Sequence, residues 1–197
     1  MAIANTHDPL AQTFKIEEDS GCFITKVDLF FAAKDNNLPV WVELRNVVNG
    51  YPGKKLLPFG RKVLEPSEVN VDGITAQTAT TFTFDSPVYV QEGEEYCLVV
   101  MTSSLDYRVW IAQMGESDIG GTSRVVSRQP VLGVLFKSQN NSAWNAIQMQ
   151  DLKFTLYKAN FAGTQGTVTL NNGFIGDSIT AENGSTVVYG RRLLPNP

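Results

Sequence analysis

The residues best suited to catalysis in this chain are a single histidine and two cysteines. His7 lies in a polar N-terminal stretch, and Cys22 and Cys97 lie in separate apolar runs. Histidine-activated nucleophiles and zinc sites both need several such groups close together in space. Cysteines in apolar runs are typical of buried thiols, and no glycine-rich phosphate-binding motif is present. We therefore expect no catalytic residue, no metal site and no cofactor.

Carboxylates are the remaining groups that could take part in catalysis or bind a metal ion. Glu92, Glu94 and Glu95 crowd one predicted turn, where acidic side chains usually stay solvated and protect a sheet edge. An alternative is a structural calcium site, of a kind found in jelly rolls, built from Asp85, Asp106 and Asp118. Because their spacing does not match an EF-hand loop, the sequence favours the solvated interpretation.

Aromatic side chains indicate binding rather than catalysis. Trp41 alternates with Glu43 and Arg45 along one predicted strand face, which predicts that it is partly exposed. Exposed rings stack on sugars or anchor protein interfaces, and packing in or beside the core is the alternative. The residues for which we expect a surface contact are Trp41, Tyr51, Tyr107, Trp110, Trp144, Phe174, Val187 and Tyr189.

The composition limits the class of partner. The chain is 43% hydrophobic and 18% charged, with a net charge of −4, which is enough apolar material for a folded core. A mildly acidic chain without a basic cluster binds nucleic acid and anionic membranes poorly. No apolar run approaches the ~20 residues of a membrane span, and the N-terminus has neither region of a signal peptide. We expect neither nucleic acid nor a membrane as partner.

Alternating side chains indicate the strands that must position these residues. Between residues 39 and 48, one side carries only Val40, Val42 and Leu44. That side should be core, and the opposite side should be solvent or a partner. No window of ten or more residues has the spacing of an amphipathic helix. Many short strands separated by turn signals predict an all-β fold, a jelly-roll-like antiparallel β-sandwich.

The centre of this sandwich is predicted between Phe82 and Trp110. Alternation up to Phe84, the polar turn at 91–94 and the apolar run at 96–101 predict two strands joined as a hairpin. The apolar run is too short for a helix and is apolar on both faces. We therefore expect a central strand that is covered on both sides.

The composition changes after Phe161, where Gly, Asn, Thr and Ser dominate. The few apolar residues beyond this point cannot form a separate core. We predict a β-sandwich domain over residues 1–161 and an extended C-terminal segment over residues 162–197. That segment would pack on a partner or lead into a further domain.

Four stretches resemble a known family of structural proteins. They are Asp-Pro-Leu-Ala-Gln-Thr-Phe at 8–14, Val-Asp-Leu-Phe-Phe at 27–31, Gln-Pro-Val-Leu-Gly-Val-Leu-Phe-Lys-Ser-Gln-Asn at 129–140 and Asp-Leu-Lys-Phe-Thr-Leu-Tyr-Lys-Ala-Asn-Phe at 151–161. Together they are similar to a β-sandwich module in large tail or baseplate proteins of contractile-tailed, T4-like bacteriophages, notably cyanophages. The resemblance spans roughly residues 8–161. It implies a building block of a longer chain, with no catalytic residues to carry over.

The resemblance favours a non-enzymatic structural module of the virion, in the tail, baseplate or fibre-attachment region. Its partners would be other virion proteins or copies of itself, and it would be synthesised in the host cytoplasm. The alternative is a carbohydrate-binding or host-receptor-binding module with a host glycan as ligand, which Trp41, Tyr107 and Trp110 favour. A hydrolase that acts through two carboxylates is a third hypothesis.

Overall fold

Strands make up almost all of the regular structure of this protein. The computed structural model describes residues 8–117, 119, 124–127 and 133–161, together with the backbone of residues 2–5, 178–180 and 186–188. The strands are β1 (Ala2–Asn5), β2 (Leu10–Lys15), β3 (Cys22–Leu29), β4 (Phe31–Ala33), β5 (Val40–Val48), β6 (Tyr51–Leu64), β7 (Thr80–Val90), β8 (Glu95–Thr102), β9 (Arg108–Gln113), β10 (Leu135–Lys137), β11 (Asn145–Ile147), β12 (Gln150–Leu152), β13 (Phe154–Lys158), β14 (Ser178–Thr180) and β15 (Thr186–Val188). The predicted all-β sandwich is confirmed. A short 3₁₀ turn, Pro66–Glu68, follows β6, and no helix of the described residues is long and apolar enough to cross a membrane.

Contacts between residues divide the chain into two compact units, residues 1–160 and 161–197. The first unit holds β1 to β13 and the hydrophobic core. In the second unit, β14 and β15 form an antiparallel pair in which Ile179 lies opposite Val187.

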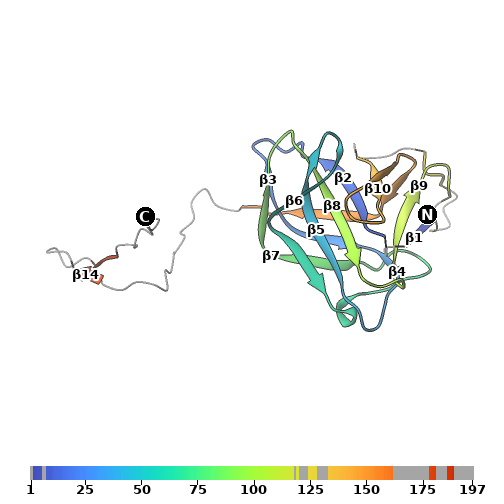
Figure 1. The fold of residues 1–197 in the computed structure, drawn as a ribbon, viewed down its shortest axis with the longest axis horizontal. Helices are drawn as coiled ribbons and strands as arrows, with labels where there is room; N and C mark the ends of the chain where they lie inside the picture. The colour runs from blue at the N-terminus through green and yellow to red at the C-terminus, as the bar shows by residue number, and fades with distance from the viewer. Residues whose placement is uncertain are drawn as a thin grey trace. The chain divides into compact units, whose positions relative to one another are not determined.

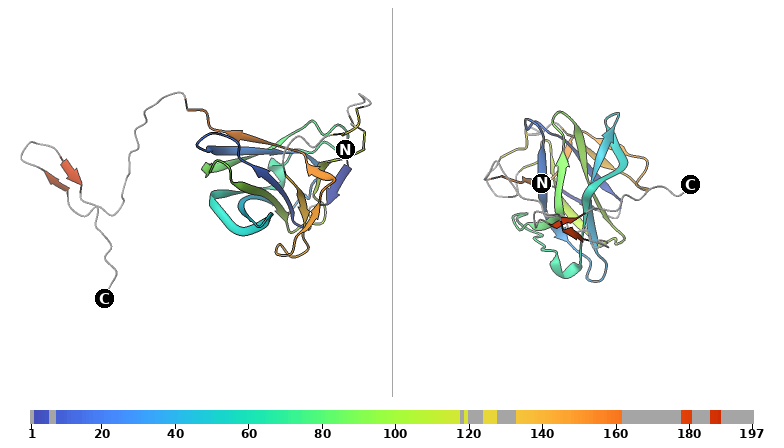
Figure 2. Two further views of the ribbon diagram at one scale, coloured as in Figure 1. Left: turned by 90° about the horizontal axis from the view of Figure 1, so that it is seen from above. Right: turned by 90° about the vertical axis from the view of Figure 1, so that its left-hand side faces the viewer.

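Three antiparallel sheets build the first unit (Figures 1 and 2). The largest sheet has the strand order β11-β10-β2-β8-β5-β6. The second has the order β13-β3-β7, and the third gathers β1, β4 and β12 around β9. One continuous hydrophobic core joins residues from all three sheets, so the unit folds as a single sandwich.

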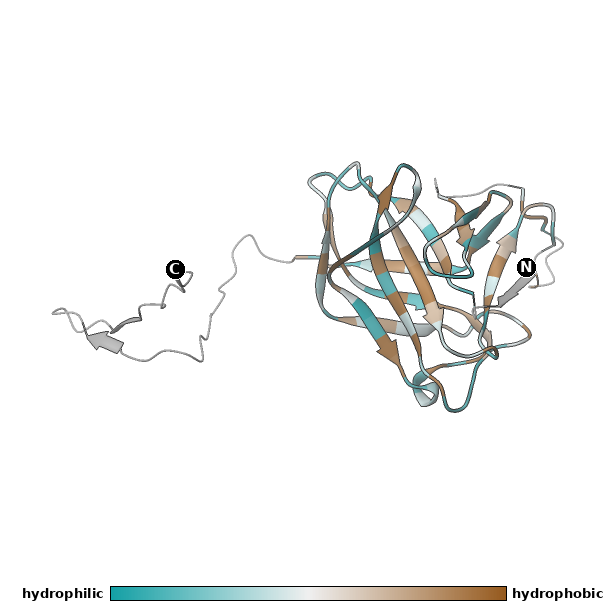
Figure 3. Ribbon diagram, viewed as in Figure 1, coloured by the Kyte–Doolittle hydropathy of each residue, from teal (hydrophilic) through white to brown (hydrophobic). Residues whose placement is uncertain are grey.

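The predicted central strand is β8, which lies inside the six-stranded sheet between β2 and β5. Leu98 and Val100 face the main core, whereas Cys97 and Val99 belong to a second buried cluster on the opposite face. Figure 3 shows hydrophobic colouring along most of β8. Burial of both faces explains why this strand is a continuous apolar run rather than an alternating one.

The predicted hairpin between residues 82 and 101 is wrong. β7 pairs with β3, whereas β8 pairs with β2 and β5, so the two strands belong to different sheets. Between them, the N–H of Gly93 donates to the carbonyl of Ile16, and the N–H of Ile16 donates to the carbonyl of Glu94. The turn therefore pairs with the end of β2 and carries the chain from one sheet to the other.

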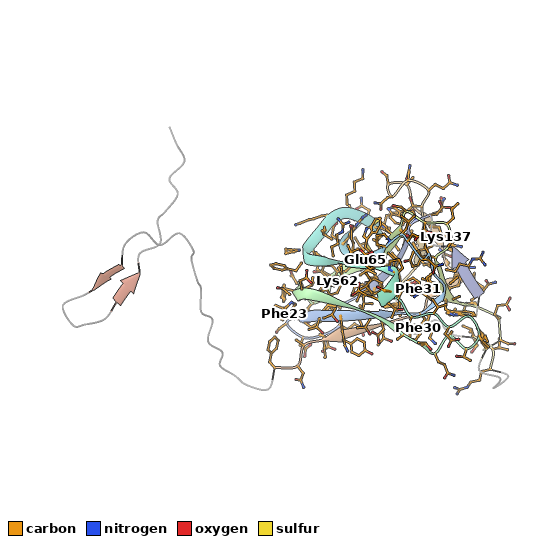
Figure 4. The ribbon with its side chains drawn as sticks, turned by 90° about the horizontal axis from the view of Figure 1, so that it is seen from below. Phe23, Phe30, Phe31, Lys62, Glu65 and Lys137 are labelled. Carbon is orange, nitrogen blue, oxygen red and sulfur yellow. The ribbon has the colours of Figure 1, made fainter. Side chains whose placement is uncertain are left out.

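Aromatic rings fill the interior between the sheets. Phe31 lies 6.3 Å from Phe82 and meets Tyr107 edge to face at 5.9 Å between ring centroids. Figure 4 shows Phe31 within the body of the domain and Phe23 at its margin. Large rings in such tilted contacts contribute strongly to the stability of a core.

The two faces of β5 show what covers the large sheet. Val40, Val42 and Leu44 are buried in the main core, as the alternation predicts. The opposite face, for which solvent or a partner was expected, is covered in large part by the chain itself. Trp41 packs there in the second buried cluster, together with Phe136 of β10 and Trp144.

Candidate functional site

Three of the predicted contact residues lie together on the outer face of the six-stranded sheet. Trp41 and Trp144 pack against the second cluster, and the half-exposed ring of Tyr51 lies 5.6 Å from that of Phe136. We call these four residues the aromatic face. β5, β6 and β10 of one sheet hold three of the rings, and Trp144 immediately precedes β11.

A buried ion pair lies beside these rings on the same face of β5. Arg45 Nη2 lies 2.5 Å from Glu43 Oε2, and Arg45 Nη1 donates to Asn141 Oδ1 at 2.9 Å. Both charged residues are less than 10% exposed. The guanidinium of Arg61 lies over the Trp41 ring, 5.5 Å from its centroid. The alternation of β5 placed Glu43 and Arg45 on the face of Trp41, but nothing in the sequence indicated that they are buried.

The charged and thiol groups at this face are paired or buried. The carboxylate of Glu43 lies at contact distance from the guanidinium of Arg45, so the two opposite charges are paired. Burial raises the pKa of the nearby Cys97 thiol to about 12, so that thiol stays protonated at neutral pH and is a poor nucleophile.

A second exposed apolar feature runs along β6, the edge strand of the six-stranded sheet. Its exposed apolar side chains are Tyr51, Leu56, Phe59 and Val63. Phe59 is 63% exposed and has a φ of 61°, a conformation that bulky residues rarely adopt. We call these four residues the β6 edge.

A bulge produces the unusual conformation of Phe59. Glu43 lies opposite Arg61 and Arg45 lies opposite Leu56, so five steps along β6 match two steps along β5. The extra residues loop outward and carry Phe59 away from the sheet. At Gly60 the chain rejoins the sheet. A Cβ atom at this position would lie 3.1 Å from the carbonyl oxygen of Leu44.

Tyr107 and Trp110, for which a surface contact was predicted, are buried. Tyr107 is completely buried, and its hydroxyl donates to the carbonyl of Leu38 at 2.7 Å. The Trp110 indole N–H donates to the carbonyl of Asp72 at 2.7 Å. Both residues therefore hold loops onto the core. Their sequence pattern resembles that of an exposed strand because the polar groups that cover them come from distant segments.

The remaining predicted contact residues lie in the second unit. Val187 belongs to β15, of which the backbone is described, whereas Phe174 and Tyr189 lie outside the described residues. Their predicted role in contacts stays a prediction.

The acidic groups considered above do not converge within the described part of the chain. Asp85 pairs with Lys62 at 2.7 Å, and Glu92 accepts the Ser20 N–H at 2.8 Å. Asp118 lies outside the described residues. No three His, Cys, Asp or Glu side chains with the arrangement of a metal site occur among the residues that the structure describes.

Comparisons with known proteins identify no relative of this chain. No family model, curated protein or solved structure matches the chain. Function must therefore be inferred from the residues and their geometry.

Proposed function

We propose that this chain is a non-enzymatic structural module of a bacteriophage virion and acts by packing against other proteins. The β6 edge is the observation that carries this proposal. Among the described strands it pairs only with β5, and it carries four exposed apolar side chains. An exposed edge strand offers backbone groups to another chain, and the lysines and the bulge of β6 limit which chains can pair there.

Phe59 strengthens the case for a partner at this edge. A residue in a sparsely populated conformation costs the isolated protein roughly 1–3 kcal/mol and is usually found where it has a function. Here the strained backbone presents an aromatic ring to solvent, and aromatic anchors dominate the energy of protein interfaces. A partner that buries Phe59 would recover the cost of holding it outside the domain.

The sequence resemblance described above is the reason that we propose a virion as the location. The stretches that carry it, at 8–14, 27–31, 129–140 and 151–161, are similar to sandwich modules of phage tail and baseplate proteins. In the present structure the first of these contributes β2 and the last contributes β12 and β13. These strands belong to the scaffold, whereas the β6 edge would contact the neighbours.

Cross-linking mass spectrometry of purified virions tests this proposal. Lys54 and Lys55 are exposed on β6 beside the apolar residues, so an amine-reactive cross-linker should join them to another virion protein or to a second copy. Lys26 on β3 is partly exposed and is not part of the edge, so it serves as the comparison. Absence of the chain from virions, or cross-links of Lys54 and Lys55 confined to their own domain, would refute the proposal.

The aromatic face supports a second candidate function, binding of a glycan. Trp41, Tyr51 and Trp144 gather beside the Glu43–Arg45 pair, and sugar-binding sites combine stacking rings with fixed polar groups. A glycan array separates the two functions. Loss of a glycan signal in Tyr51→Ala, with retention in Phe59→Ala, would favour glycan binding, and no signal for the unaltered protein would exclude it.

A further inference from the structure

An open groove lies on another side of the sandwich, between β2 and β13. Its volume is about 730 Å³. Apolar residues from all three sheets line it, and they include Phe14, Ile16, Ile24, Leu152, Phe154 and Leu156. The lining also holds three lysines and three acids, so it carries no net charge. These are Lys15, Lys153, Lys158, Glu17, Glu18 and Asp151.

The edge of β13 faces this groove with its hydrogen-bonding groups. The N–H groups of Lys153 and Ala159 donate to carbonyls of Trp110 and Phe23 on the opposite side of the strand. Backbone groups alternate in direction along an antiparallel strand, so those of Phe154, Leu156 and Lys158 point toward the groove. Among the described residues, β13 pairs only with β3.

The edge of β2 is open at the same level. β10 pairs with residues Leu10 to Gln12, and the N–H of Thr13 donates to the carbonyl of Val134. By the same alternation, the next outward groups belong to Lys15, which lines the groove. No described strand pairs with Lys15 on that side.

The side chain of Gln12 forms hydrogen bonds with both strand edges at one end of the groove. Its buried amide takes the N–H of Leu152 on Oε1 at 2.9 Å. Its Nε2 lies 3.1 Å from Asp151 Oδ1 and 3.3 Å from the carbonyl oxygen of Thr13. A single side-chain amide thus joins β12 to β2 at the end of the groove, as a peptide group of an intervening strand would.

We infer that the groove is a strand-acceptor site, which takes an extended, uncharged segment of a neighbouring polypeptide. The inserted strand would pair with β13 and place alternate apolar side chains against Phe14, Phe154 and Leu156. Main-chain hydrogen bonds provide affinity in such strand additions, and side-chain pockets provide specificity. An apolar small molecule would leave the backbone groups of both edges unpaired, which is unfavourable once they lose contact with water. This inference rests on the proposed packing function and names the form of the partner segment.

The native thiol of Cys22 provides a reporter for this site. Cys22 is half-buried and lines the groove, whereas Cys97 is fully buried elsewhere and serves as the internal control. The probe is a synthetic peptide with the sequence of residues 166–172, which is uncharged and alternates Thr with Val and Leu. A matched peptide that is N-methylated at alternate residues retains the side chains but loses the strand hydrogen bonds.

With the full-length protein, the peptide should slow alkylation of Cys22 about tenfold at saturation and slow amide exchange at Phe154 and Leu156 similarly. The Thr155 amide, which points toward β3, should change little, and the methylated peptide should have no effect. Equal protection by both peptides would show an apolar pocket rather than a strand site. No protection, or a Cys22 that is already inaccessible in the free protein, would also overturn the inference.

The peptide experiment and the virion cross-linking experiment can fail independently of each other. Cross-links at Lys54 and Lys55 in virions, combined with no response of Cys22 to the peptide, would overturn the groove inference alone. A clear response of Cys22 in a chain that is missing from virions would overturn the virion function alone.

Discussion

Cys97 and Tyr107 are buried groups that the fold keeps protonated. Burial raises the pKa of each to about 12, from ordinary values of 9.0 and 10.0, and the carboxylates of Asp35 and Glu65 add to the effect on Tyr107. In the unfolded chain these groups lose their protons at lower pH. Between the two pKa values the folded protein therefore binds more protons than the unfolded one, and its stability falls as pH rises.

For Cys97 this effect gives a measurable pH dependence. The free energy of unfolding should be unaffected by this thiol below pH 9 and should fall above it by up to about 1.4 kcal/mol per pH unit. Cys97→Ala removes the ionising group, so its loss of stability between pH 9 and 10.5 should be smaller by up to about 2 kcal/mol. Urea denaturation of both proteins across this range checks the prediction, and parallel curves would contradict it.

The Glu43–Arg45 pair predicts a non-additive response to mutation. Among the described residues, Arg45→Met leaves the buried Glu43 carboxylate with the longer ion pair to the exposed Arg61, at 3.8 Å. The substitution should cost about 3–5 kcal/mol. The double variant Glu43→Leu with Arg45→Met removes both charges and should be clearly more stable than Arg45→Met. A double-mutant cycle by urea denaturation measures the coupling, and additive losses would show that the pair is not an electrostatic unit.

At the scale of elements, strands could be predicted from the sequence far better than their partners. β5 and β8 lie where alternation and the apolar run at 96–101 indicated them. The wrong hairpin arose because periodicity reports which side chains are buried and not which strand lies alongside. β2 pairs with both β8 and β10, and no local signal connects such distant segments.

The candidate sites were predictable to different degrees, because sequence patterns report local exposure and not which distant segments lie together. Trp41 could be proposed because it alternates with Glu43 and Arg45 along one strand face, and Tyr51 because it follows the Asn49-Gly50 turn signal. The groove could not, because it exists only where the edges of two sheets meet, and its polar bridge depends on Gln12 reaching residue 152. The positive φ of Phe59 was equally hidden, since no glycine or asparagine occupies that position.

The bulge in β6 predicts an unusual substitution effect. Phe59→Gly relieves the left-handed backbone and should leave the isolated protein equally stable or more stable by up to about 1 kcal/mol. Leu105 is similarly exposed but lies outside the positive-φ positions, so Leu105→Gly should lower stability by about 0.5–1 kcal/mol. Thermal unfolding of the two variants tests this contrast. A loss for Phe59→Gly as large as that for Leu105→Gly would show that the conformation carries no strain.

For the whole molecule, the division after Asn160 predicts an independently stable first unit. Its core residues lie between Leu10 and Leu152, so a chain that ends at Asn160 retains all of them. Its melting temperature should lie within about 3 °C of that of the full chain, and limited proteolysis should leave a fragment of that size. Failure of the shortened chain to fold, or cleavage within the first 160 residues, would contradict this expectation.

The position of β2 in the six-stranded sheet also has a consequence during synthesis on the ribosome. Phe14 pairs with Tyr96 and Gln12 pairs with Leu135, so β2 is synthesised long before either of its neighbouring strands. Until those segments emerge, the nascent chain carries an apolar strand with two open edges, and such edges attract other chains. Pairings this distant also slow folding. We therefore expect chaperones that bind short apolar segments to bind residues 10–16 of the nascent chain.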